Sequence, residues 1–135
     1  MTDLDTLLAE LRTRTPETII DRVAMALAEV GEAASALGAR DDYDTVSLWW
    51  AAGTLSSAYA AVLPYTSIDL PDPPAGPGPL VDAPERMIEL LSAVADTLAH
   101  VARTAADPDL IYALTTAGNL TEQARRGLVN VMAAV

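Results

Sequence analysis

The chain has 135 residues, of which 51% are hydrophobic, enough to build the core of one domain. It carries 19 acidic and 8 basic residues, a net charge of −11. We therefore expect no binding to nucleic acid, because a protein needs a basic surface to bind the phosphate backbone. Cysteine is absent, which excludes disulfides, thiolate metal ligands and thiol nucleophiles.

Two helices are predicted in the N-terminal part of the chain. Leucines recur every three or four positions in residues 2–14, which predicts a short amphipathic helix. A second helix is predicted to start at Thr15 and Pro16, because threonine is a good N-cap and proline is tolerated at the first helical position. It should end near Leu37, where Gly38 provides a C-terminal stop.

A third helix is predicted over residues 45–63, with Asp44 as its N-cap and Pro64 directly after its end. No charged side chain occurs between residues 45 and 68. The segment has nearly the length of a membrane span, but serine, threonine and glycine interrupt it and no basic cluster flanks it. We therefore expect a helix outside the membrane.

Prolines are concentrated after this helix, and we expect a long extended connection over about residues 64–82. Asp82 and Glu85 have the spacing of a capping box and predict the start of a fourth helix. A fifth helix should begin at Asp107 and Pro108, and its apolar positions on one side are Leu110, Ile111, Leu114, Ala117, Leu128 and Met132. At Gly118 we expect a kink or an uninterrupted helix in preference to a complete break.

No segment alternates β-branched and polar residues as a strand does, so the predicted fold is all-α. We expect one domain over residues 1–135, a four-helix bundle preceded by the short N-terminal helix. Two antiparallel helical hairpins, joined by the proline-rich linker, would form the bundle. About twenty residues can cross the length of a bundle, so the direction of one hairpin relative to the other stays open.

A pair of acids, Glu29 and Glu32, lies in the phrase "RVAMALAEVGEAASAL" of the second predicted helix. The phrase resembles the metal-binding helix of the MazG-like all-α nucleoside triphosphate pyrophosphohydrolases. The resemblance implies that the two glutamates hold a metal ion that activates water on a nucleotide phosphate. The family has a second acidic pair on the next helix, whereas here the nearest acids at that spacing, Asp41 and Asp44, precede the charge-free helix.

Helical geometry favours a simpler interpretation of this glutamate pair. At about 100° per residue the apolar positions of the second helix cluster on one side, and Glu29 and Glu32 point away from them. We therefore expect both carboxylates on a solvated face. No other cofactor or metal signature is present, and His100 lacks the preceding glutamate of the ferritin-like di-iron motif.

The third predicted helix is apolar around its whole circumference, although no helix of a small bundle is surrounded on all sides. Val46, Trp49, Trp50 and Gly53 fall outside its main core stripe, and tryptophan is a favoured interface anchor. These four residues are our candidate interface in a homodimer. The alternative is that the proline-rich linker covers the tryptophans.

The sequence therefore favours a small protein that acts by association, with itself or with another protein, and without a cofactor. The divergent pyrophosphohydrolase is the alternative function. The first residues are acidic and have no secretory hydrophobic segment, so we expect a cytoplasmic protein without membrane contact. Abundant alanine, and arginine without any lysine, indicate a bacterial genome rich in GC.

Overall fold

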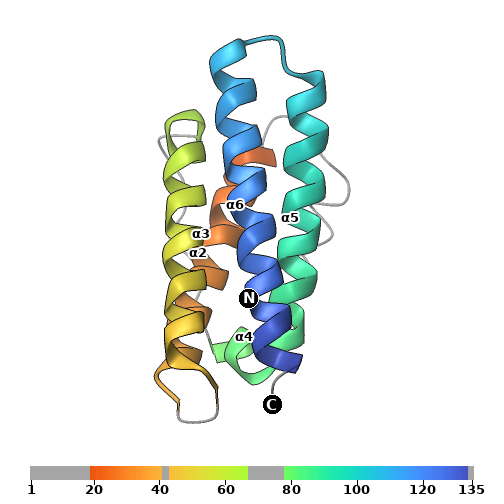
Figure 1. The fold of residues 1–135 in the computed structure, drawn as a ribbon. Coiled ribbons are helices and arrows are strands. Elements are labelled where there is room, and N and C mark those ends of the chain that lie inside the picture. The colour runs from red at the N-terminus through yellow and green to blue at the C-terminus, as the bar shows by residue number, and fades with distance from the viewer. Residues whose placement is uncertain (1–18, 41–42, 67–77, 134–135) are drawn as a thin grey trace.

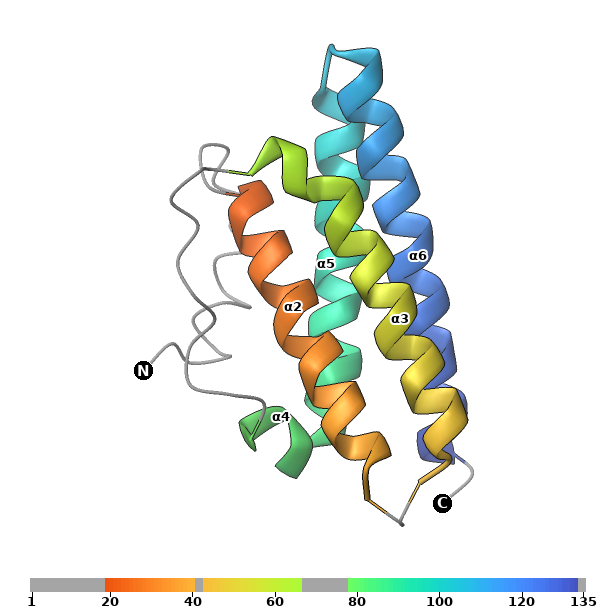
Figure 2. The same ribbon diagram turned by 90° about the vertical axis from the view of Figure 1, so that its left-hand side faces the viewer.

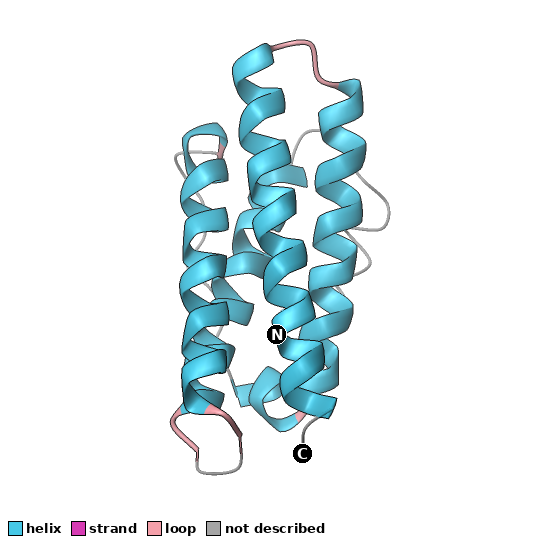
Figure 3. Ribbon diagram, viewed as in Figure 1, coloured by secondary structure: helices cyan, strands magenta, loops and turns pink. Residues whose placement is uncertain are grey.

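A computed structural model describes residues 19–40, 43–66 and 78–133. Every regular element within these residues is helical, and no strand occurs among them (Figure 3). The prediction of an all-α fold is confirmed. The predicted N-terminal helix lies outside the described residues.

The described chain forms four long helices and two short ones. The long helices are α2 (Ile19–Gly38), α3 (Thr45–Val62), α5 (Pro84–Thr104) and α6 (Pro108–Ala133). A 3-10 turn, η1 (Leu63–Tyr65), follows α3, and the five-residue α4 (Gly78–Asp82) precedes α5. α6 continues through Gly118 without a break. An uninterrupted helix is one of the two arrangements predicted for this position.

The four long helices lie side by side in a ring (Figure 1). α2 packs against α3, α3 against α6, α6 against α5, and α5 against α2. Figure 2 shows that α2 and α6 run in one direction while α3 and α5 run in the other. Each helix is therefore antiparallel to both of its neighbours, and η1 and α4 lie at opposite ends of the ring.

The core lies along the inside of this ring and consists mainly of leucine, alanine and valine. Leu27, Leu55, Leu91 and Leu114, one from each long helix, are all at most 1% exposed. Alanines such as Ala33 let neighbouring helices approach closely. Burying such side chains contributes about 25 cal/mol per Å² of apolar surface, the main term that favours folding.

Asp44 is the N-cap of α3, as predicted. Its Oδ1 accepts hydrogen bonds from the backbone N–H groups of Val46 (3.1 Å) and Ser47 (3.3 Å). The Ser47 hydroxyl donates to Oδ2 at 2.8 Å. These hydrogen bonds, the one from the Ser47 hydroxyl foremost, hold the pKa of Asp44 below its ordinary value.

The predicted extended connection over residues 64–82 is wrong at its end, where α4 forms. Leu80 and Val81 are buried, and α4 packs against α2 and α5. Pro79 is compatible with this short helix because it stands in the first turn, where the missing N–H needs no partner. Burial of two apolar side chains stabilises a helix that has no amphipathic repeat of its own.

The predicted cap of α5 is also wrong. Ala83 occupies the N-cap position and makes no side-chain capping hydrogen bond. Asp82 belongs to α4, and its carboxylate lies 3.8 Å from the Arg40 guanidinium in an exposed ion pair. Pro84 at the first position of α5 sets the helix start instead, since its φ is already helical.

Candidate functional site

One side of α3 is exposed along the entire length of the helix and carries no charge. We call this surface the α3 outer face; it consists of Val46, Trp49, Trp50, Gly53, Ser56, Ser57, Ala60 and Leu63. The opposite side of α3 is buried in the core through Leu48, Leu55 and Val62. All four predicted interface residues lie on the outer face. Whether they form an interface stays a prediction.

The outer face extends further than the sequence prediction. The sequence prediction omits Ser56, Ser57 and Ala60, which are small and give little hydrophobic signal, and Leu63, which ends the predicted helix directly before Pro64. Their spacing could have found them, since residues 46, 53 and 60 are seven apart, and so are residues 49, 56 and 63. Positions seven apart lie on one side of a helix.

Trp49 leans against the C-terminal end of α2. Its Nε1 donates a long hydrogen bond of 3.4 Å to the carbonyl oxygen of Ser35. A Cβ atom on Gly38 would lie 2.8 Å from Cδ1 and Nε1 of the indole, so this contact requires glycine. Gly38 does end α2 as predicted, but without a left-handed φ, and its absent side chain makes room for Trp49.

Trp50 leans the other way, against α6. A Cβ atom on Gly127 would lie 3.3 Å from Cζ3 of its indole. Trp49 remains 55% exposed and Trp50 53% exposed, while Val46 beside them is 76% exposed. The two indoles thus pack against α2 and α6, on either side of α3, and each tryptophan remains about half exposed.

Two hydroxyls of α3 are satisfied within the helix. The Ser57 hydroxyl donates to the carbonyl oxygen of Gly53 at 3.3 Å, and that of Thr54 to the carbonyl oxygen of Trp50 at 2.9 Å. A hydroxyl that is already bonded to its own helix loses less when a neighbour covers it. The serine at position 57 therefore adds little polarity to the outer face.

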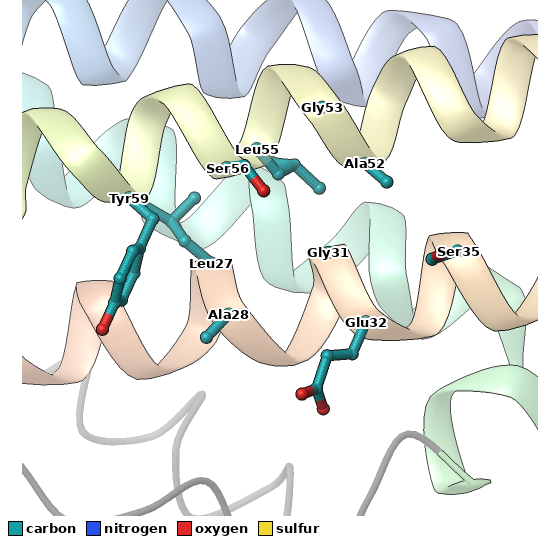
Figure 4. Close-up of a pocket in the computed structure, with 10 residues that line it drawn as sticks. All are labelled: Leu27, Ala28, Gly31, Glu32, Ser35, Ala52, Gly53, Leu55, Ser56 and Tyr59. Carbon is teal, nitrogen blue, oxygen red and sulfur yellow. The ribbon is translucent and has the colours of Figure 1, made fainter.

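A shallow groove of about 400 Å³ runs beside the outer face, between α2 and α3 (Figure 4). Gly53, Ser56 and Tyr59 line it from α3, and Gly31 and Glu32 line it from α2. Most of its lining side chains are small. In Figure 4 the Glu32 carboxylate and the Tyr59 ring are the large groups at its edge.

The prediction that both glutamates of the pair lie on a solvated face is wrong for Glu29. Glu32 is exposed, but Glu29 is only 7% exposed. Burial raises the pKa of Glu29 above its ordinary value, and the negative charge of Glu32 raises it further. Among the described residues, Glu29 has no hydrogen-bond or ion-pair partner.

α2 is buried on more than one side. The helix contacts α3, α5 and α4, and three consecutive residues, Ala24–Ala26, are all buried. Consecutive residues point about 100° apart, so burial of all three means that most of the circumference is covered. A helical projection with a single apolar stripe misses this arrangement.

Of the two acids that could form a second pair beside Glu29 and Glu32, the structure describes only Asp44. Asp44 caps α3, and Asp41 lies outside the described residues. Within residues 19–40, 43–66 and 78–133, no group of three or more histidine, aspartate or glutamate side chains is placed to share a metal ion. A raised pKa also disfavours the anionic form of Glu29, which a metal ligand requires.

The stretch Thr45–Tyr65 is long and apolar enough to cross a membrane by length and composition alone, and it is the one such helix among the described residues. A core helix of a soluble protein passes the same test. Comparison of the chain with protein-family models, with curated proteins and with solved structures finds no match.

Proposed function

We propose that this protein acts by binding another protein chain through the α3 outer face, without catalytic chemistry. The observation that carries the proposal is the exposure of two adjacent tryptophans, each about half exposed, on a charge-free helix face. Tryptophan is enriched among the residues that contribute most to binding at protein interfaces. An exposed apolar patch of this kind marks an interaction site.

Charge distribution supports the same proposal. The chain carries a net charge of −11, yet no charged residue occurs from Thr45 to Thr66. Charged residues are depleted at the centres of interfaces because they lose hydration there. An anionic membrane surface is a poor alternative partner, since α3 offers no basic residue to attract it. We place the protein in the cytoplasm of a bacterium, in keeping with its sequence.

A photo-crosslinking experiment tests this proposal. Benzoylphenylalanine replaces Ala60 on the outer face in one variant and Ser92, exposed on α5, in the matched control. Each variant is expressed in bacterial cells and irradiated, and its adducts are identified by mass spectrometry. We expect a discrete protein adduct, either with this chain or with a different one, from position 60 and not from position 92.

Two results would contradict the proposal. The first is an identical pattern of adducts at the two positions, or none at either. The second is co-sedimentation of the purified protein with phosphatidylcholine–phosphatidylglycerol vesicles that Gly53→Arg abolishes and Ser92→Arg does not. That result would make the face a membrane contact.

A further inference from the structure

We infer that the partner of the α3 outer face is a second copy of this chain, and that the two α3 helices cross antiparallel at Gly53. This inference rests on the proposed association function and names the occupant of its surface. It comes from the arrangement of large and small side chains on the face, which is complementary to itself.

The outer face consists of three rows of residues spaced seven apart. The central row is Val46, Gly53 and Ala60. The row on the α2 side contains Trp49, which contacts α2, and Ser56, which lines the groove beside α2. The row on the α6 side contains Trp50, which contacts Gly127 of α6, and Ser57. Leu63 continues the row on the α2 side beyond Ser56. In each row a large residue (Val46, Trp49 or Trp50) stands before a small one (Ala60, Ser56 or Ser57).

A two-fold axis that passes between the two α3 helices, perpendicular to them and level with Gly53, brings large residues against small ones. Such an axis reverses the helix but keeps the α2 side of one copy against the α2 side of the other. Val46 then faces Ala60, and on the two sides Trp49 faces Ser56 and Trp50 faces Ser57. A parallel pair would instead set tryptophan against tryptophan and leave the small residues facing each other across a gap.

Gly53 suits the crossing point because its Cα faces open space in the monomer. A Cβ atom at this position would meet no atom within 4 Å. Glycine in a helix interior is less stable than alanine, and no contact inside the bundle offsets this destabilisation. Close approach of a second helix is the kind of contact that only glycine allows.

Charge and area are consistent with a second copy. Two molecules of charge −11 repel, and the uncharged outer face lets them meet with least repulsion. A fully buried aromatic removes about 150–250 Å² from water, so two half-exposed indoles offer roughly 160–270 Å² per copy. A specific interface needs about 500 Å² per copy. The indoles provide a third to a half of this, and the other residues of the outer face provide the remainder.

Sedimentation of the purified wild type and of two arginine variants tests the pairing. At tens of micromolar we expect a dimer for the wild type and for the control Ser92→Arg, and a monomer for Gly53→Arg. The Gly53→Arg side chain has open space in the monomer, so its helix content should be unchanged by circular dichroism. A monomeric wild type, or a Gly53→Arg protein that remains a dimer, overturns the inference.

Engineered cysteines test the direction, and the chain has no native cysteine to interfere. Residues 46 and 60 lie about 21 Å apart along a helix, whereas a disulfide needs Cα atoms within about 7 Å. The double variant Val46→Cys/Ala60→Cys should form a covalent dimer on mild oxidation. Val46→Cys alone and the control Ser92→Cys should not. A covalent dimer of Val46→Cys alone would mean parallel helices and overturn the inference.

The two proposals can fail separately. A monomeric wild type whose position 60 still crosslinks to one different protein keeps the association function and removes the second copy as its partner. Absence of both dimer and adduct removes both proposals.

Discussion

The indole of Trp49 occupies the space that a side chain at position 38 would need. A Cβ atom on Gly38 would lie 2.8 Å from two ring atoms of Trp49, closer than such contacts occur in proteins. The end of α2 and the start of α3 are therefore fitted to each other through one glycine and one tryptophan. The outer face depends on this contact for the position of one of its two indoles.

Gly38→Ala should push the Trp49 ring away from α2 and break its hydrogen bond to the Ser35 carbonyl. We expect the fluorescence of Trp49, measured with Trp50 replaced by Phe, to shift to longer wavelength as the ring becomes more hydrated. Ala36→Gly in the same loop-proximal turn is the control and should leave the emission unchanged. An unshifted spectrum in Gly38→Ala would show that the ring is not held there.

Gly31, unlike Gly38, has room for the side chain of alanine. A Cβ atom there would lie 3.8 Å from the Cβ of Leu55, an ordinary van der Waals distance. Gly31→Ala should raise the free energy of unfolding by about 0.5–1 kcal/mol, because alanine loses less backbone entropy in a helix. This corresponds to a rise in Tm of about 2–4 °C for a chain of this size. A fall in Tm would mean that the groove between α2 and α3 is tighter than the structure describes.

Sequence patterns predicted the long helices well because capping and periodicity are local properties. Asp44 is an acid directly before an uncharged stretch, and Pro108 stands in the first turn of α6. The predicted boundaries of α3 and α6 accordingly agree with the structure to within a residue or two. The all-α class followed from the same local signals.

Other features depend on contacts between distant segments, and no local sequence pattern indicates them. α4 forms because Leu80 and Val81 find buried positions against α2 and α5, which no local repeat reveals. Glu29 is buried on α2, a helix that contacts three other elements, and no local pattern indicates its burial. Half of the outer face is predicted by the sequence: Val46, Trp49, Trp50 and Gly53 are among the candidates, whereas Ser56, Ser57, Ala60 and Leu63 are not.

The N-cap of α3 gives a prediction with a defined pH range. Hydrogen bonds from the Ser47 hydroxyl and from backbone N–H groups lower the pKa of Asp44. A carboxyl with a lowered pKa stabilises the fold above its unfolded pKa of about 3.9, and the stabilisation is lost as the pH falls through the lower folded value. Asp44→Ala should therefore lower Tm at pH 7, and the difference from wild type should shrink below pH 4.

Asp44→Asn is the matched control, because asparagine caps helices well but does not titrate. Its Tm at pH 7 should lie close to that of the wild type. Thermal unfolding followed by circular dichroism from pH 2.5 to pH 7 measures all three proteins. A Tm of Asp44→Ala equal to that of the wild type at pH 7 would contradict the capping role.

Glu29 should affect stability with the opposite pH dependence. Burial, reinforced by the charge of Glu32, raises its pKa, so the folded protein binds the proton more tightly than the unfolded chain does. The stability contributed by the protonated carboxyl is fully present below the unfolded pKa of about 4.3 and is lost as the pH rises through the folded value. Glu29→Gln, which keeps the shape without the charge, should therefore be more stable than the wild type at pH 7 and equal to it near pH 4.

Glu32→Gln separates the two causes of the raised pKa. Glu32 is exposed, so its replacement should have little direct effect on stability. It should narrow the difference between the wild type and Glu29→Gln at pH 7, because it removes the charge that repels the Glu29 carboxylate. Urea unfolding of the four proteins at pH 4 and pH 7 measures this double-mutant cycle. A Glu29→Gln protein less stable than the wild type at pH 7 would contradict this prediction and would mean that the Glu29 carboxylate has a stabilising partner.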